Sequence, residues 1–457
     1  MKVVKMLNNK ILNNSEKIEK ILLYIFLLAA LFILIYNIFN YDPAQGYDAD
    51  AHFLYVDILP RITNLLPENT YEYFNPPLPY IFPSIVGTIC ERVFLEDFMT
   101  CKSLYINFIQ VLQFFMFILS TYFYLKTLEL LKPKDISLKL SFIILLFLLT
   151  ANYKTFAMFR GETYIVLLNS YLLYRFATLV KNSFKWVPKD YIIFGLVIGL
   201  LALSRQWAFL LFPPYFLIYI FLRKDRKLKY LKFIIYSFVL GFLVSSWWYF
   251  RLFIEFGSFT AFNMDNYGFN FSNYPFSFYF PFNTEALLVF TQPIRSNFKN
   301  QFLPILYSDL WGDYWGYFSF TSNSLDTGRN QLYIGDYLAR VNIVSLFATF
   351  ILLAGLKIGF QALFTKNKED FEIFNSLVFL SVLSSFSGYL WFLIKYPSYN
   401  GNTIKAVYII QLFHLMCLLG AFYMKKIKNS NQNIYYFFIV LLVLSFIHNF
   451  SSMLSHY

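Results

Sequence analysis

Charged residues are scarce throughout this chain of 457 residues. Asp, Glu, Lys and Arg together make up 14% of it, whereas hydrophobic residues make up 58%. A typical soluble domain carries roughly 25% charged residues. Because the deficit extends over the whole length, it excludes a soluble protein with a single anchor and predicts an all-α polytopic membrane protein.

Cysteine is scarce as well, with three in the chain. Cys90, Cys101 and Cys417 lie in or beside apolar stretches. Their spacing matches neither a metal-binding motif nor a disulfide framework. We therefore expect all three to serve as small apolar packing residues.

Acidic residues are outnumbered, 26 against 38 Lys and Arg, which gives a net charge of +12. In a soluble protein such an excess would point to nucleic acid. Here the basic residues gather in short loops between apolar runs, as the positive-inside rule requires of cytoplasmic loops. No nucleic-acid-binding motif accompanies them. We therefore expect membrane lipids, and no nucleic acid, among the partners.

Long apolar runs predict about eleven transmembrane helices. Residues 1–20 form a basic cytoplasmic tail, and 21–40 form the first span, since about 20 apolar residues cross a hydrocarbon core of about 30 Å. A large first extracytoplasmic loop follows at 41–98, with juxtamembrane helices expected over 50–66 and from Pro76 to Glu91. The other spans are expected at 99–125, 140–156, 163–180, twice within 191–222, 233–250, 337–360, 371–394, 404–423 and 434–450.

This pattern divides the chain into three larger regions after the tail. Residues 21–250 form a membrane module that contains the first extracytoplasmic loop. Residues 251–337 form a long, polar, aromatic-rich extracytoplasmic loop with few helical periods, in which Trp311 and Trp315 are expected to lie at the lipid headgroups. Residues 338–457 hold the C-terminal transmembrane helices.

The first extracytoplasmic loop carries a dense set of polar residues, with Asp48, Asp50 and His52 near its start and Asn75 before two prolines. The predicted topology puts further charges on the same face, beside the ends of apolar runs. Charges at such positions are costly and typical of a site or a pathway. These further residues are Arg160, Glu162, Arg205 and Lys405.

Acids and cations on one face of a membrane favour a particular chemistry. A carboxylate can take the proton from an acceptor hydroxyl. Cations can hold a phosphate group and stabilise the charge that it gains as it leaves. An enzyme that uses a lipid-phosphate donor needs both kinds of group within reach of the headgroups.

Two segments of the first loop carry a family resemblance. Residues 46–55 (GYDADAHFLY) and 75–80 (NPPLPY) resemble the first luminal loop of GT-C superfamily glycosyltransferases. The likeness is strongest to the branch that includes the protein O-mannosyltransferases and the bacterial lipid A aminoarabinose transferase. Residues 404–408 (IKAVY) look like the Lys-Ala-Thr-Tyr-like segment of some bacterial members. The order of spans and loops is similar too.

The resemblance implies a GT-C-like bundle and a hexosyl- or mannosyltransferase activity. Such an enzyme moves a sugar from a polyprenyl- or dolichyl-phosphate carrier to a hydroxyl of a glycan, lipid or protein acceptor, at the extracytoplasmic face and with inversion. It implies that Asp48 or Asp50 is the catalytic base. His52, four residues after Asp48, would orient the acid or contact the sugar.

The resemblance also implies a set of substrate-binding residues. Asn75 stands where the aminoarabinose transferase has a lysine that contacts phosphate. The cation must then come from elsewhere, and Arg160, Arg205 or Lys405 would supply it, with Glu162 close to them. Bacterial inner membranes and the endoplasmic reticulum both fit such a multi-pass enzyme.

The same residues allow other interpretations. Asp48-Ala-Asp50 has the form of an Asp-x-Asp motif, which binds a divalent metal in nucleotide-sugar enzymes, but a metal or other cofactor is not expected here. Asp48 can also serve as a helix N-cap, and the basic residues can snorkel to the interface. His414, in mid-span, is expected to be a satisfied core histidine. At the level of the whole protein, the alternatives are a transporter or flippase of lipid-linked sugars and a non-catalytic membrane subunit.

Overall fold

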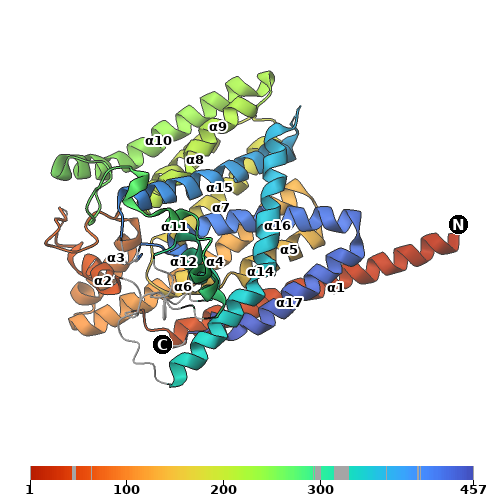
Figure 1. Cartoon of the computed structure of the whole chain (residues 1–457). Helices are drawn as coiled ribbons and strands as arrows, with labels where there is room; N and C mark the ends of the chain where they lie inside the picture. The colour runs from red at the N-terminus through yellow and green to blue at the C-terminus, as the bar shows by residue number, and fades with distance from the viewer. Residues whose placement is uncertain are drawn as a thin grey trace.

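The computed structural model of the chain describes residues 2–43, 48–62, 64–291, 293, 300–312, 329–366, 368–398, 401 and 403–455. For residues 2–14 and 329–334 it describes the backbone alone. All the regular elements within these ranges are helices, as the composition predicts. The long helices run side by side in one bundle (Figure 1).

Eight helices of the described part are long and apolar enough to cross a membrane. This finding confirms the expectation of a polytopic membrane protein. The eight are α1 (Lys2–Asn40), α4 (Phe98–Leu131), α7 (Glu162–Lys181), α10 (Lys224–Phe256), α14 (Arg329–Phe364), α15 (Asp370–Lys395), α16 (Ile410–Ser430) and α17 (Gln432–Met453).

A ninth crossing is possible for a bent pair of helices, α5 (Ile136–Leu148) and α6 (Thr150–Ala157). The sequence predicts a span over 140–156, which stays a prediction, and the structure adds that the chain bends by 65° between the two helices. Leu149 at the bend has an extended backbone with φ −65° and ψ 100°. The bend turns α6 toward the interior of the bundle, where all eight of its residues are buried.

The two spans expected within 191–222 are short helices in the structure. They are α8 (Pro188–Ala202, 15 residues) and the 3₁₀ helix η2 (Gln206–Leu211) followed by α9 (Pro213–Phe221). The expected break at 204–207 is confirmed. The total of eleven spans stays a prediction. Whether this pair crosses the membrane twice or not at all, the chain returns to the same side, so every later helix crosses in the same direction.

Glycines let two pairs of helices approach closely. A Cβ atom on Gly195 of α8 would lie 2.6 Å from the carbonyl oxygen of Ser237 on α10. One on Gly355 of α14 would lie 2.5 Å from the backbone nitrogen of Gly420 on α16. Small residues at such crossings are typical of membrane helices, because lipid tails give no hydrophobic drive to association and close van der Waals contact replaces it.

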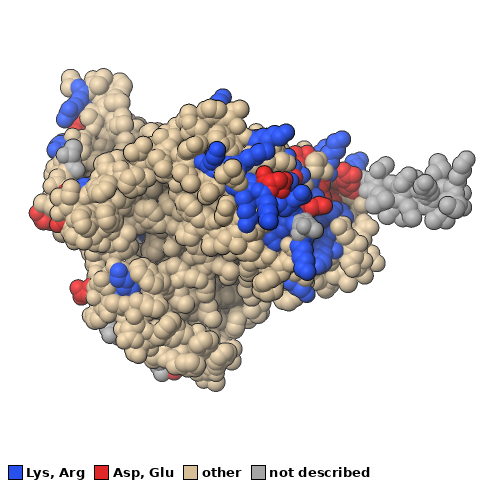
Figure 2. Space-filling model, turned by 90° about the horizontal axis from the view of Figure 1, so that it is seen from above, with Lys and Arg blue, Asp and Glu red and all other residues tan. Residues whose placement is uncertain are grey.

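Basic side chains gather at the end of the bundle where α1 begins (Figure 2). Ion pairs join loops and helix ends there, among them Lys428 with Glu19 and Lys425 with Asp135. The helices of the first loop, α2 (Ala49–Ile58) and α3 (Leu78–Val93), lie at the opposite end (Figure 1). The separation agrees with the distribution of Lys and Arg along the sequence.

Both helices expected in the first loop are present. The first is shorter than expected, because α2 ends at Ile58, two residues before Pro60. Asp57 ties it to α4, since Lys102 Nζ and Tyr105 Oη donate to its carboxylate at 3.2 and 2.6 Å. The second helix begins directly after Pro76-Pro77 and carries Pro79 in its first turn, where a missing N–H costs no hydrogen bond.

A disulfide joins Cys90 on α3 to Cys101 on α4. The expectation that these two cysteines are free packing residues is therefore wrong. They are 11 residues apart in the sequence, but the tight turn from α3 to α4 brings their Cα atoms to 5.5 Å. The expectation is confirmed for Cys417, which is free and buried.

The long loop expected over 251–337 contains more helix than its sequence predicts. Helix α10 extends to Phe256, and the described part of the loop then holds η3 (Phe271–Asn273), α11 (Phe276–Tyr279), η4 (Thr284–Phe290) and α12 (Phe302–Trp311). Trp311 is fully buried, so the expected place at the headgroups is wrong for it. Trp315 lies outside the described residues.

Candidate functional site

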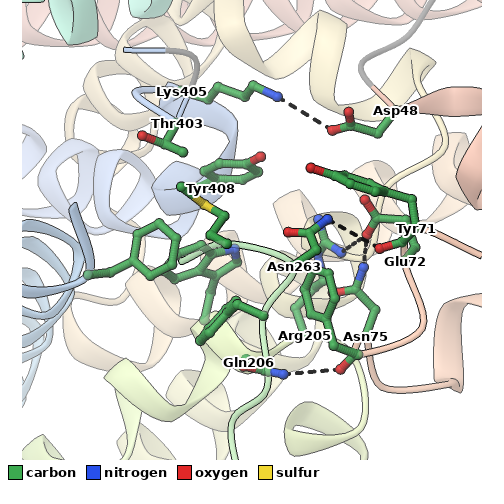
Figure 3. Close-up of a pocket in the computed structure, with 15 residues that line it drawn as sticks. Asp48, Tyr71, Glu72, Asn75, Arg205, Gln206, Asn263, Thr403, Lys405 and Tyr408 are labelled. Carbon is green, nitrogen blue, oxygen red and sulfur yellow. Dashed lines mark hydrogen bonds and ion pairs between the residues drawn. The ribbon is translucent and has the colours of Figure 1, made fainter. Parts of the chain in front are cut away.

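A cavity of about 210 Å³ lies at the end of the bundle that holds α2 and α3. Four segments far apart in the sequence line it: the first loop, the break after α8, residues 262–264 and the region from 392 to 408. Charged residues face it from three of them, with Asp48 and Glu72 from the first loop, Arg205 from the break, and Lys405 (Figure 3). The sequence predicts three of these four residues as part of the site.

Asp48 and Lys405 face one another across the cavity (Figure 3), with Oδ2 and Nζ 3.6 Å apart. The Asp48 side chain is 37% exposed, whereas that of Lys405 is nearly buried. Burial alone would raise the pKa of Asp48. The positive charge of Lys405, with Arg160 and Arg205 further away, outweighs burial and lowers this pKa below its ordinary value. Asp48 is therefore a carboxylate at neutral pH.

The proposed capping role of Asp48 does not fit its geometry. Asp48 precedes the first residue of α2 with φ +54°, in the left-handed region. Within the described part of the chain, its side chain makes no capping hydrogen bond to α2. The carboxylate instead points toward Lys405 (Figure 3). A backbone conformation that is uncommon for a non-glycine residue thus aims this acid at the cavity.

Asp50 lies elsewhere. It is on the first turn of α2, its side chain is exposed, and it does not line the cavity. The structure therefore brings one of the two candidate bases, Asp48, to the cavity.

Arg205 lies between two buried carboxylates. Its Nε is 3.1 Å from Glu162 Oε1, and its Nη1 is 3.4 Å from Glu72 Oε2. Gly161 permits this arrangement, because a Cβ atom there would lie 2.6 Å from Cγ of Arg205. The glycine between Arg160 and Glu162 is thus required for the Arg205 stem to cross the start of α7.

Glu72 is a site residue that the sequence analysis missed. It lines the cavity, it is buried, and its Oε2 also accepts a hydrogen bond from Asn75 Nδ2. Burial raises the pKa of Glu72, an effect that the nearby Arg205 only partly offsets. The sequence did offer one signal for Glu72: it precedes Asn75 by three residues, and a turn brings two residues at that spacing together.

His52 is near Glu72 and Arg160. Its Nδ1 is 2.8 Å from the Tyr80 hydroxyl and 3.9 Å from Glu72 Oε2, and its Nε2 is 3.4 Å from Arg160 Nη1. Burial lowers the pKa of His52 well below the ordinary value, and Arg160 lowers it further, so the ring is neutral. His52 therefore orients the charged groups behind the cavity. Its expected direct role at Asp48 or at a sugar stays a prediction.

Asn75 holds two of these groups in place. Its Nδ2 donates to Glu72 and, at 3.4 Å, to the hydroxyl of Tyr80. Its carbonyl oxygen accepts from Tyr55 Oη at 3.1 Å. Arg205 contacts the same Glu72 oxygen as Asn75, and its expected role as the cation that holds a phosphate stays a prediction.

Aromatic rings form the wall below Lys405. The Lys405 ammonium lies 5.3 Å from the centre of the Tyr408 ring, and Tyr408 stacks on Trp207 at 5.3 Å with an angle of 26° between the rings. Phe262 and Phe392 also line the cavity. The cavity thus joins a charged side to an aromatic side, which suits a ligand that has both a phosphate and a ring with apolar faces.

Among the described residues, no group of three or more His, Cys, Asp and Glu side chains is placed to hold a metal ion. His414 is buried as expected of a core histidine, but it is only partly satisfied: its Nε2 lies 2.7 Å from Asn152 Oδ1, whereas its Nδ1 has no hydrogen-bond partner among the described residues.

Comparisons with protein families and with curated proteins find no relative of this chain. The likeness to GT-C glycosyltransferases therefore stays a prediction from the sequence segments given above. The functional argument depends on the site itself.

Proposed function

We propose that this protein is an integral membrane glycosyltransferase of GT-C type. It transfers a sugar from a polyprenyl- or dolichyl-phosphate carrier to an acceptor hydroxyl, with inversion at the anomeric carbon. The observation that carries the proposal is the cavity in which the Asp48 carboxylate faces the Lys405 ammonium and which the Arg205 guanidinium also lines. A base and two cations in one cavity are what such a transfer needs.

The proposed reaction uses each of these groups at a stated atom. Asp48 accepts the proton of the acceptor hydroxyl while that oxygen attacks C1 of the donor sugar. The bond from C1 to the phosphate oxygen breaks, and its electron pair stays on the phosphate. Lys405 and Arg205 stabilise the phosphate as its charge grows. The products are the glycoside and the lipid phosphate.

The contact between Asp48 and Lys405 has a role in this scheme. In this structure the ammonium pairs with the proposed base. A donor phosphate competes for that ammonium, and its arrival releases the Asp48 carboxylate to face an acceptor. Burial raises the pKa of Glu72, so Glu72 competes less strongly with the phosphate for the charge of Arg205. The donor then binds before the acceptor.

Two observations support an extracytoplasmic site. Lys and Arg gather at the end of the bundle opposite the cavity (Figure 2), and positive charge marks the cytoplasmic side of membrane proteins. The Cys90–Cys101 disulfide joins α3 to α4 at the cavity end, and disulfides persist in oxidising compartments. Together they favour a multi-pass protein of a bacterial inner membrane or the endoplasmic reticulum, with its cavity facing away from the cytoplasm.

One observation favours the second candidate, a transporter or flippase of lipid-linked sugars. The 65° bend between α5 and α6 breaks a span, and broken spans are typical of transporters. Here α6 carries Lys154 into the bundle interior, where its side chain is fully buried. The charged cavity nevertheless lies at one end of the bundle, which fits an enzyme that works at one face.

Sealed vesicles of known orientation distinguish the two candidates. The donor panel is polyprenyl phosphate carrying radiolabelled mannose or glucose, and membranes that lack the protein are the control. An enzyme yields label covalently joined to a new acceptor, together with free lipid phosphate. A transporter moves the intact carrier between leaflets without breaking it. Translocation of intact carrier with no covalent transfer would contradict the glycosyltransferase proposal.

A further inference from the structure

Two side chains from other elements hold the backbone around Lys405. The Tyr389 hydroxyl on α15 accepts a hydrogen bond from Lys405 N at 2.8 Å and donates to Thr403 O at 2.6 Å. On the other side, Asp309 Oδ2 accepts from the backbone N–H of Ala406. The segment therefore has a fixed path past the cavity although it is not helical before Ala406.

Asp309 is itself part of a buried ion pair. Its Oδ1 lies 3.4 Å from Lys154 Nζ, and both side chains are 0% exposed. Lys154 comes from α6, after the bend. Thr150 in the first turn of α6 donates to the carbonyl oxygens of Leu310 and Trp311, both at 2.7 Å. The bend and α12 are thus joined beneath the segment that carries Lys405.

Stability alone does not explain why the buried Lys154–Asp309 ion pair is present. Removing a charge from water costs several kcal/mol per ion, and apolar residues of similar volume often replace a buried pair without loss. What an apolar pair lacks is an acceptor for Ala406 N–H. An ionised carboxylate holds such a donor roughly twice as strongly as a neutral acceptor. The second oxygen of Asp309 provides that acceptor, one residue after Lys405.

We infer that Asp309 is a positioning residue for Lys405, and that Lys154 neutralises the buried carboxylate that does this. Asp309 fixes the peptide between Lys405 and Ala406, so that the ammonium enters the cavity opposite Asp48. The bent span exists, in this account, to bring Lys154 to Asp309. What Lys405 binds rests on the proposed function, whereas the control of its position does not.

Two double variants separate the acceptor from the charges. Lys154→Gln with Asp309→Asn removes both charges and keeps an oxygen that can accept from Ala406 N–H. Lys154→Met with Asp309→Leu removes both charges and the acceptor. Each is combined with Lys405→Cys, and the rate at which a small positively charged thiosulfonate labels the new thiol is measured. The other thiols do not interfere, because Cys90 and Cys101 form a disulfide and Cys417 is buried.

The Gln/Asn variant is expected to label at close to the rate of the Lys405→Cys protein alone, because the new amide oxygen still accepts from Ala406 N–H, although less strongly than the carboxylate. The Met/Leu variant is expected to label severalfold faster or slower, because its segment has moved. Equal rates in both variants would overturn the inference. If the Met/Leu variant does not fold, Lys154→Met with Asp309→Ala replaces it, since this pair also lacks the acceptor.

A binding measurement separates this inference from the proposed function. Polyprenyl phosphate without a sugar is titrated into the same proteins in nanodiscs. The Met/Leu variant should bind more weakly than the Gln/Asn variant. The difference should vanish when Lys405→Met is added, because residues 154 and 309 affect binding only through the position of Lys405. A changed labelling rate with no carrier binding in any protein would contradict the proposed function and leave the positioning role intact.

Discussion

Two sets of ion pairs, one at each end of the bundle, differ in how far their side chains are buried. At the basic end, Arg223 and Asp225 are 3.4 Å apart with side chains 59% and 64% exposed. At the cavity end, Arg205, Glu72 and Glu162 form ion pairs while almost wholly buried. An exposed pair contributes about 0–1 kcal/mol, whereas each buried charge costs several kcal/mol unless it is partnered. The exposed Arg223–Asp225 pair therefore contributes little to stability, whereas the buried group at the cavity end carries a cost that we attribute to the proposed function.

The largest difference between the ends is expected from removing one cation. Arg205→Met leaves Glu72 and Glu162 buried without their guanidinium, which should cost about 3–5 kcal/mol. Arg223→Met, the matched change at the basic end, should stay within about 0.5 kcal/mol. Thermal unfolding of both variants in detergent measures the difference. Equal unfolding midpoints would mean that Arg205 does not compensate the buried charges of Glu72 and Glu162.

The two ends should also differ in redox state. Cys90→Ser with Cys101→Ser removes the link between α3 and α4 and should destabilise the protein by about 2–4 kcal/mol. In intact cells, a maleimide should fail to label Cys90 and Cys101 until a reductant is added. Labelling without reductant would contradict the oxidised, extracytoplasmic environment of the cavity end.

The cations of the cavity end should control affinity for the carrier phosphate. Lys405→Met removes a charge-assisted hydrogen bond worth about 1.5–3 kcal/mol, which corresponds to a roughly 10- to 150-fold weaker binding of polyprenyl phosphate. Lys395→Met is the control, because Lys395 stacks on Trp391 and Tyr396 and does not line the cavity. Equal binding by the two variants would contradict the role of Lys405.

A smaller effect is expected in the pH dependence of transfer. The lowered pKa of Asp48 lies below 3.8, so its carboxylate form persists from neutral pH down past that value. Transfer should therefore lose the contribution of this base only as the pH falls through the lowered pKa. Lys405→Met removes the main cause of the lowering and leaves burial, which raises the pKa. The acidic limb of the residual activity should then move to higher pH, and an unmoved limb would argue against the Asp48–Lys405 coupling.

The fold could be predicted from the sequence wherever a single apolar run decides the structure. The eight long helices match runs that the sequence marks by length alone. The bend at Leu149 could not be predicted, because α5 is apolar on both sides of the helix and neither Pro nor Gly interrupts it. The disulfide was missed for a similar reason, since the turn that joins Cys90 to Cys101 is a property of the tertiary packing.

The site was predictable in part. Arg205 and Lys405 were found because charges beside apolar runs are conspicuous, and Asp48 because it lies in the polar first loop; all three line the cavity. Glu72 was missed because it sits among loop residues, where an acid normally faces water. Asp309 was visible in the sequence, but its role depends on Lys154 and Ala406, which are 155 and 97 residues away from it in the chain. Contacts at such separations are not encoded in any local pattern.

The central claim is that the Asp48 carboxylate acts as the base in sugar transfer. The most direct test uses purified protein in proteoliposomes with polyprenyl-phosphate mannose or glucose, comparing the native chain with Asp48→Asn and Asp50→Asn at matched amounts. We predict that Asp48→Asn lowers transfer about 10²- to 10⁴-fold while the binding of bare polyprenyl phosphate is kept, and that Asp50→Asn transfers at nearly the native rate. Undiminished transfer by Asp48→Asn would contradict the account.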